Sequence, residues 1–227
     1  MTPATQAQQA RYARVLSAAA EILSAEGGDA IQMKDLAQRA GVSLATLYRY
    51  FPSKDYVLLA LAVARYQEAA RKVFAETPQG NSVRERVTNY LLRDFHAQQR
   101  DKRLTATFVQ ALTRTRRDNS AIIETIEHLH VQIIRHVAAG EGTLSDRQLR
   151  VLPIVIDIFT TAGRLWLAGV MTAAEVEAEI KIGCELLELP DDVVAAELDR
   201  AAPDTRLGWN GTAAGADGGP AWSAQLS

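Results

Sequence analysis

The chain lacks the features that mark secreted and membrane-spanning proteins. Cys184 is the only cysteine among its 227 residues, so no disulfide can form within the chain, which suits a reducing cytoplasm. The sequence has no run of ~18 apolar residues that could span a membrane, and its first residues lack the apolar core of an export signal. We therefore expect a cytoplasmic protein without a membrane segment.

The chain also lacks a strong excess of charge of either sign. Its formal net charge is −2, so the protein as a whole is not a basic nucleic-acid binder. The charge is uneven, however, because residues 1–54 contain six basic and four acidic side chains, a net charge of +2, which leaves −4 for the remainder. A slightly basic head on an acidic body favours contact between a polyanion and the head.

No segment shows the alternation of apolar and polar residues that is typical of a β-strand. Apolar residues recur at helical spacing instead, and glycine or proline separates the helical patterns at 27–28, 52–53, 77–81 and 140–142. The sequence therefore predicts an all-α fold, with short helices in residues 1–54 and a larger helical domain in 55–202. Residues 203–227 are rich in Gly, Ala and polar side chains, and we expect a flexible tail there.

The segment "DLAQRAGVSLATLYRY" (Asp35–Tyr50) has the pattern of a helix-turn-helix. Ala37 is small enough for a second helix to approach, Gly41 accepts a positive φ at the turn, and Leu47 seals the pair from the second helix. A further set of residues is expected to point inward, namely Leu36, Ala40, Val42 and Tyr50.

The second helix of this pair would expose a short face with little acid, as a helix that reads the DNA major groove should. Ser43 can cap this helix, Thr46 can contact a phosphate or a base edge, and Arg49 can pair with guanine or with a phosphate. Leu44 and Ala45 offer apolar contacts to thymine methyl groups. The alternative is an ordinary pair of amphipathic helices with a solvated charged face.

Residues around this face could hold the DNA backbone. The hydroxyls of Tyr48 and Tyr50 can reach phosphates while their rings pack on the scaffold. Lys54 stands at a helix start, where free backbone N–H groups also favour a phosphate, and Lys34 could contact the opposite flank.

The stretch "DLAQRAGVSLAT" followed by "LYRYFPSK" closely resembles the DNA-binding domain of the TetR family of bacterial transcriptional regulators, over about residues 10–60. The resemblance implies a homodimer that binds double-stranded palindromic operator DNA and releases it when a small molecule enters the larger domain. The family often has threonine near the start of the helix before the turn, where this chain has Gln32 and Met33. The family's DNA-facing positions fall on Lys34, Ser43, Leu44, Ala45, Thr46, Tyr48, Arg49, Tyr50 and Lys54.

The larger domain, at residues 55–202, would then carry effector binding and dimerisation. Its segment "QLRVLPIVIDIFTTAGRLWLAG" (Gln148–Gly169) is apolar around most of its circumference, so the helix has two sides to bury. A core on one side and a partner subunit on the other would satisfy both, and a two-fold operator favours this dimer over a central helix in a monomer. Asp157, Thr161 and Arg164 share a face of this helix and could line a pocket or form an ion pair between subunits.

The stretch "LTATFVQALTRTRRDNSA" (Leu104–Ala121) faintly resembles actinobacterial TetR-type repressors of sterol catabolism, which respond to acyl-CoA thioesters. This resemblance implies a large apolar or acyl-CoA-like effector. Arg114, Arg116 and Arg117 could hold a CoA phosphate, or simply complement the dipole of a helix end. Candidate effector contacts, of which the apolar ones are alternatively simple core residues, are Phe95, Phe108, Leu112, Ile126, Leu129, Ile133, Asp157, Thr161 and Trp166.

No pattern of catalytic, metal-binding or cofactor-binding residues stands out. Glu124 and His128 share a helix face, but no further ligand accompanies them, and Cys184 has no evident base beside it. We therefore expect no enzyme, no metal and no cofactor. Two alternatives to a repressor stay open, an activator of the same fold and an interaction protein that has lost DNA binding.

Overall fold

The computed structural model describes residues 5–27, 31–115, 120–190 and 192–193. The tail predicted at 203–227 lies outside the described residues, as do Arg116 and Arg117. None of the described helices is both long enough and apolar enough to cross a lipid bilayer.

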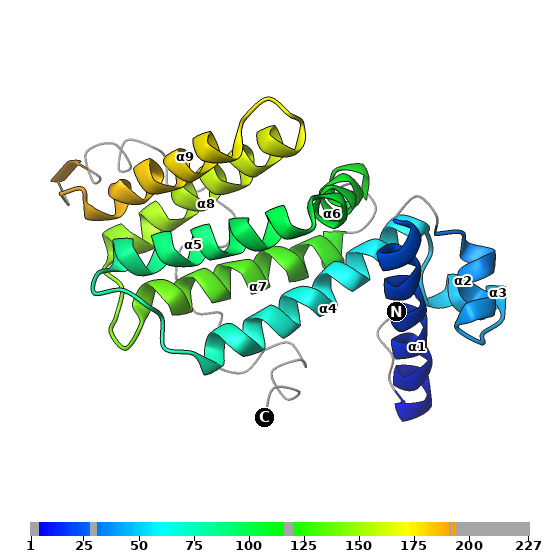
Figure 1. The fold of residues 1–227 in the computed structure, drawn as a ribbon. Helices are drawn as coiled ribbons and strands as arrows, with labels where there is room; N and C mark the ends of the chain where they lie inside the picture. Colours follow the sequence, from blue (N-terminus) through cyan, green and yellow to red (C-terminus); the bar gives the residue numbers. More distant parts are fainter. Residues whose placement is uncertain (1–4, 28–30, 116–119, 191, 194–227) are drawn as a thin grey trace. The chain divides into compact units, whose positions relative to one another are not determined.

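Every regular element in the described residues is a helix, so the predicted all-α fold is confirmed (Figure 1). A short 3-10 helix, Leu186–Glu188, follows the last α-helix. In chain order the α-helices are α1 (Gln6–Glu26), α2 (Met33–Arg39), α3 (Leu44–Tyr50), α4 (Lys54–Ala75), α5 (Val83–Arg100), α6 (Lys102–Thr115), α7 (Ser120–Ala139), α8 (Asp146–Leu167) and α9 (Ala173–Glu185).

The chain packs as two compact units that do not follow the order of the sequence. The head unit comprises Met1–Ala70 and His96–Gln132, and the body unit comprises Arg71–Phe95 and Ile133–Ser227. Helix α6 therefore belongs to the same unit as α1, α2 and α3. The functional division predicted between residues 54 and 55 stays a prediction.

In the head unit, the periodicity of α1 decides which of its side chains form the core. Val15, Ala19 and Ile22 are spaced four and three apart, and each is at most 2% exposed. The N-terminus of α1 is closed by a capping box, in which Thr5 accepts from the backbone of Gln8 and the Gln8 side chain accepts from Thr5. Gly27 ends the helix with φ 90°.

In the body unit, α8 and α9 pack closely together. An added Cβ at Gly183 of α9 would lie 3.1 Å from Cδ1 of Ile158 on α8, so a larger residue there would require Ile158 to shift. Capping boxes at Ser145 and Thr172 fix the start of each helix. The core side of α8 includes Val151, Leu152, Val155, Phe159, Ala162 and Trp166.

Arg86 of α5 closes the C-terminus of α7. Its Nη2 donates to the carbonyl oxygen of Ala138 at 2.7 Å, and its Nη1 donates to that of Gly80 at 3.4 Å. One guanidinium thus provides a donor for the helix-end carbonyl of Ala138 and also binds Gly80 in the connection between α4 and α5. Gly140 follows α7 with φ 57°, and an added Cβ there would lie 3.1 Å from Nε of Arg86.

We expect Arg86→Ala to lower the free energy of unfolding by about 1–3 kcal/mol, because it leaves a partly buried helix-end carbonyl without its donor. Urea denaturation followed by circular dichroism would measure the change. Arg84→Ala is the matched control, since the ion pair of Arg84 with Glu185 (3.0 Å) is exposed to solvent and is worth only about 0–1 kcal/mol. Equal effects of the two substitutions would contradict the role given to Arg86.

Candidate nucleic-acid interface

Helices α2 and α3 form the predicted helix-turn-helix. Gly41 has φ 64° at the turn, and the backbone N–H of Val42 donates to the carbonyl of Ala37 at 3.0 Å. Ala37 is 4% exposed and Leu47 is fully buried, so these three positions have the roles the sequence predicts. Leu36 and Ala40 are buried as predicted, and Val42 is half-buried.

Ser43 fixes the start of α3. Its Oγ accepts from the backbone N–H of Thr46 at 3.1 Å, as the predicted cap requires, and donates to Oγ1 of Thr46 at 2.8 Å. Both hydroxyls are therefore held at the N-terminal end of α3, where the helix dipole favours an anion.

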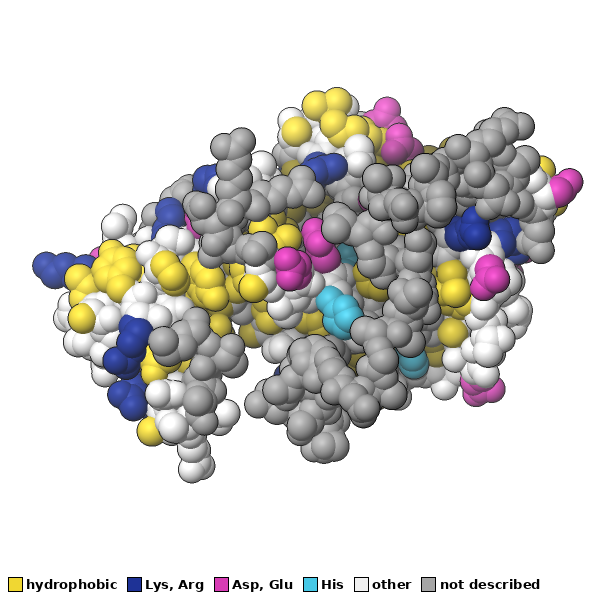
Figure 2. Space-filling view, turned by 180° about the vertical axis from the view of Figure 1, so that it is seen from behind, with side chains coloured by type: hydrophobic (Ala, Val, Ile, Leu, Met, Phe, Trp, Pro, Cys, Tyr) yellow, Lys and Arg dark blue, Asp and Glu magenta, His cyan; other side chains and the backbone are white. Residues whose placement is uncertain are grey.

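The outer face of α3 presents apolar, aromatic and basic side chains together. Leu44 is 41% exposed and Tyr48 is 47% exposed, and Ala45 and Arg49 are also exposed. Figure 2, which views the molecule from behind, shows Lys and Arg side chains next to exposed hydrophobic side chains on the head unit. Large apolar side chains left in water on so short a helix indicate a contact surface.

The two lysines of the predicted interface lie at helix starts. Lys34 is exposed in the first turn of α2, and Lys54 is half-buried as the first residue of α4. Thr46 is half-buried beneath the face of α3. Eight of the nine predicted residues are thus at least partly exposed in the head unit, and their contact with DNA stays a prediction.

Tyr50 is the exception. Its side chain is 2% exposed, and its buried hydroxyl has no hydrogen-bond partner among the described residues. The expectation that Tyr50 points inward is correct, but the expectation that its hydroxyl reaches a phosphate is wrong for this conformation. The cause is an aromatic cluster beneath α3, in which the ring of Tyr50 lies edge-on to Tyr12 at 6.3 Å.

This aromatic cluster is a feature that the sequence pattern did not reveal. Tyr12 of α1 stacks on Phe51 at 4.7 Å, and Tyr56 of α4 meets Phe51 edge-on at 6.3 Å. Burial, and to a smaller extent the nearby Tyr56, raises the pKa of Tyr12 to about 12. The available signal was the spacing of Tyr12 and Val15, which puts both on the inner face of α1. The backbone carbonyl of Ala40 also accepts from Nε of Arg14 at 3.4 Å, which adds a second link between α1 and the helix pair.

The predicted effector contacts are divided between the two units. In the head unit, Ile126 and Leu129 are buried while Phe108 and Leu112 are half-buried. In the body unit, Phe95 and Trp166 pack edge-on at 5.2 Å, and Ile133 is fully buried.

Asp157 and Thr161 are exposed on α8 and line a shallow hollow of about 310 Å³ together with Ile154, Ile158 and Glu179. Arg164 donates to the hydroxyl of Thr161 at 3.3 Å. This hollow lies on the outer sides of α8 and α9, away from the buried stripe of α8.

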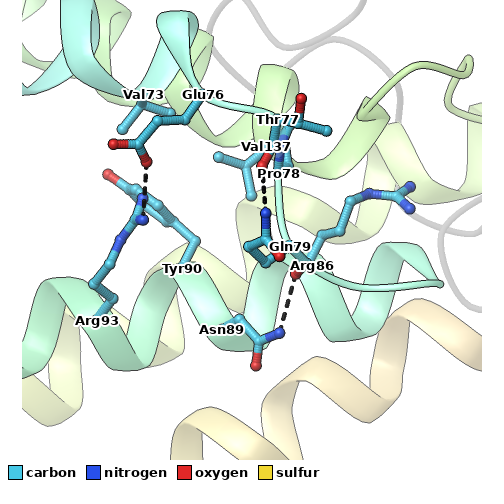
Figure 3. A pocket seen from close by; sticks show the side chains of 10 residues that line it. All are labelled: Val73, Glu76, Thr77, Pro78, Gln79, Arg86, Asn89, Tyr90, Arg93 and Val137. Atoms are coloured by element: carbon cyan, nitrogen blue, oxygen red, sulfur yellow. Dashed lines mark hydrogen bonds and ion pairs between the residues drawn. The ribbon is translucent and has the colours of Figure 1, made fainter.

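A second hollow of about 230 Å³ lies in the body unit beside the α4–α5 connection (Figure 3). Its wall includes Tyr90, and an ion pair joins Arg93 to Glu76 at 3.1 Å. Its amide groups are also engaged, since Asn89 donates to the carbonyl of Gln79 at 3.0 Å. None of the predicted effector contacts lines it.

Burial shifts the pKa of two further side chains among the described residues, those of His130 and Cys184. Burial lowers the pKa of His130, which lies 6.1 Å from the ring of Tyr66, to about 4, so this imidazole is neutral at physiological pH. Burial also raises the pKa of the Cys184 thiol. Within the described ranges, no three His, Cys, Asp or Glu side chains gather as a metal site would require.

We expect Gly41→Ala to lower the free energy of unfolding by about 1 kcal/mol. A non-glycine residue at φ 64° costs roughly 1–2 kcal/mol, partly offset by the lower entropy of the unfolded chain. Nothing lies within 4 Å of the added Cβ, so the loss comes from the backbone alone. Gly142→Ala is the control, because its added Cβ makes only an ordinary 3.6 Å contact. Thermal unfolding would measure both, and an unchanged Gly41→Ala variant would contradict the turn geometry.

Comparisons with known proteins agree with this geometry. Residues 15–61 match the family model of bacterial regulatory proteins, tetR family. Over 181 residues the chain is 28% identical to the HTH-type transcriptional repressor KstR of Rhodococcus jostii, covering 80% of this chain and 84% of the relative. It is 27% identical to KstR of Mycobacterium tuberculosis over 184 residues, covering 81% and 83%.

Solved structures show the same fold. A TetR transcriptional regulator from Rhodococcus sp. RHA1 superposes with a TM-score of 0.66 at 25% identity, covering 86% of this chain and 99% of that one. Thermus thermophilus FadR, a TetR-family repressor solved in complex with lauroyl-CoA, gives a TM-score of 0.59 at 22% identity, covering 78% and 93%. The chain therefore carries a DNA-binding domain of the tetR family of bacterial regulatory proteins at residues 15–61, and over most of its length it is similar to repressors of that family.

Proposed function

We propose that this protein is a cytoplasmic, ligand-responsive transcriptional repressor that binds a palindromic operator as a homodimer. The observation that carries the proposal is the exposed face of α3, where Leu44, Tyr48 and Arg49 project from a helix held by a buried Leu47. A short helix with an apolar, aromatic and basic face suits the major groove of double-stranded DNA.

The other predicted contacts would hold the backbone. Lys34 and Lys54 stand at the starts of α2 and α4, where a phosphate meets both a positive charge and free backbone N–H groups. Ser43 and Thr46 place hydroxyls at the start of α3. These groups would fix the register of α3 on the duplex, while Arg49 reads a base edge.

Repression is favoured over activation because a dimer that spans two half-sites blocks a promoter, and the KstR relatives carry the name of repressors. An interaction protein that had lost DNA binding would be expected to have lost or acidified the face of α3. That helix has no acidic residue in its first turn and keeps Arg49 in its last. We therefore retain the DNA-binding function for the domain predicted at residues 1–54.

The dimer would form through α8 and α9. Helix α8 buries one side in the body core, while Leu165 on its other side is 37% exposed. Val170 after α8 and Ile182 on α9 are 71% and 70% exposed, which is unusual for large apolar side chains. A second copy covering these side chains would bury them and give the two-fold symmetry that a palindromic operator requires.

The effector would be a large apolar or acyl-CoA-like molecule bound by the larger domain. The support is the similarity to the KstR repressors and the fold shared with a repressor solved with lauroyl-CoA. Arg114, which could hold a CoA phosphate, is paired with Asp55 at 3.0 Å in this conformation. A phosphate at Arg114 would therefore compete with that ion pair.

We expect Tyr48→Ala and Arg49→Ala to weaken operator binding while leaving the fold intact, because both side chains are exposed. Loss of Arg49 should cost about 1–3 kcal/mol and relax specificity at one base position. The full-length protein would first select a duplex from a randomised library. Fluorescence anisotropy at two salt concentrations would then measure affinity for that duplex, and the same assay would screen acyl-CoA thioesters for release.

Arg93→Ala serves as the control for charge, since Arg93 lies in the body unit and pairs with Glu76. Its affinity for the duplex should match that of the wild type. Unchanged affinity in both the Tyr48 and the Arg49 variant would rule out α3 as the recognition helix.

We expect Ile182→Asp to raise the dimer dissociation constant by roughly a hundredfold or more, because each of the two subunits loses roughly 1.5–3 kcal/mol of apolar burial and gains a charge at the interface. Sedimentation velocity over a concentration series would measure the constant. Ala97→Asp adds the same charge at an exposed position of α5 and should leave it unchanged. A monomeric wild type, or equal behaviour of the two variants, would refute this interface.

A further inference from the structure

Arg114 of α6 forms an ion pair with Asp55 in the first turn of α4. The guanidinium of Arg114 donates from Nε to Oδ2 of Asp55 at 3.2 Å and from Nη2 to Oδ1 at 3.0 Å. This two-pronged arrangement fixes orientation as well as distance, because both hydrogen bonds must form in one plane. The Asp55 side chain is 21% exposed, so it is better shielded from solvent than the carboxylates of the Glu76 and Glu185 ion pairs, at 58% and 62%.

Each member of this ion pair also lies at a helix end where the helix dipole favours its charge. Asp55 lies in the first turn of α4, where the dipole favours a negative charge, and Arg114 lies in the last turn of α6, where it favours a positive one. Neither dipole would favour the reverse arrangement.

The first turn of α4, which carries Asp55, is next to residues of the proposed DNA interface. Lys54, the proposed phosphate contact, immediately precedes Asp55. Ser53 caps the helix by accepting from the backbone N–H of Tyr56 at 3.1 Å, and Tyr56 packs edge-on against Phe51 at the end of α3. A shift of the first turn of α4 would therefore move both Lys54 and a packing partner of the recognition helix.

A second arginine lies at the other end of α6, next to the residue that ends α1. Arg103 precedes Arg114 by eleven residues, about three helical turns, so the two lie on nearly the same face. The guanidinium of Arg103 covers Gly27, and an added Cβ at Gly27 would lie 2.6 Å from its Cζ. Between the two arginines, Ala111 is fully buried in the same core cluster as Leu47 and Leu59.

We propose that Arg114 is a positioning residue for operator binding, acting through Asp55 on the first turn of α4. The proposal rests on the proposed function. It extends the DNA-binding machinery to a residue well beyond the matched family domain at 15–61.

Positioning and simple electrostatics predict opposite results for Asp55. If Arg114 and Asp55 act only as charges near a polyanion, Arg114→Gln weakens DNA binding and Asp55→Asn strengthens it. If the pair positions α4, both substitutions weaken binding, because each breaks the same interaction.

The experiment uses the full-length protein and the duplex that the wild type selects from a randomised library. We expect Arg114→Gln and Asp55→Asn each to weaken binding about threefold to fivefold, the upper range for a solvent-accessible ion pair. The double variant should bind like either single one. Hydrogen exchange at residues 53–58 of the free protein should be faster in all three variants, which a purely electrostatic role would not produce.

Arg93→Gln, which breaks the Glu76 ion pair of the body unit, is the matched control and should change neither readout. Opposite shifts in affinity for Arg114→Gln and Asp55→Asn, or additive effects in the double variant, would overturn the inference while leaving the proposed function standing. A wild-type protein that enriches no duplex would instead overturn the proposed function, and with it the role of Arg114 in operator binding.

Discussion

The burial of Leu47, Tyr50 and Phe51 is the interaction on which the head unit depends. Helix α3 is only seven residues long, and a helix of that length does not persist in water by its own hydrogen bonds. It exists because these side chains, all at most 2% exposed, anchor it to α1 and α4, with Ser43 closing its start. Tyr48 and Arg49 can project into solvent because their neighbours in the sequence are held in the core.

The features that could be predicted from the sequence are local. Ser43 and Thr172 cap helices through atoms three residues away, and Gly41 needs its positive φ whatever surrounds it, so short patterns reveal them. Tyr50 was ambiguous for a physical reason, because a tyrosine combines an apolar ring with a polar tip and suits either a core or a phosphate. In the structure the aromatic cluster under α3 holds the Tyr50 ring in the core. Tyr12, which packs against Tyr50 there, lies 38 residues earlier in the chain.

Long-range pairing could not be predicted, and this limits the description of the effector site. Helical periodicity shows that Phe108 and Ile133 have an inner side, but not which core that side joins. They lie in different units, because the compact units divide α4, α5 and α7 within their lengths. For the same reason the Arg114–Asp55 pair, 59 residues apart, had no signature in the sequence.

The single thiol of the chain has a practical consequence. Cys184 is fully buried on α9, and burial keeps its pKa high, so in the folded state it is both inaccessible and protonated. A thiol reagent can therefore reach it only when the packing around α9 in the body unit opens. The rate at which such a reagent modifies Cys184 therefore reports how often the body unit opens locally. The head unit has no cysteine and does not contribute to this rate.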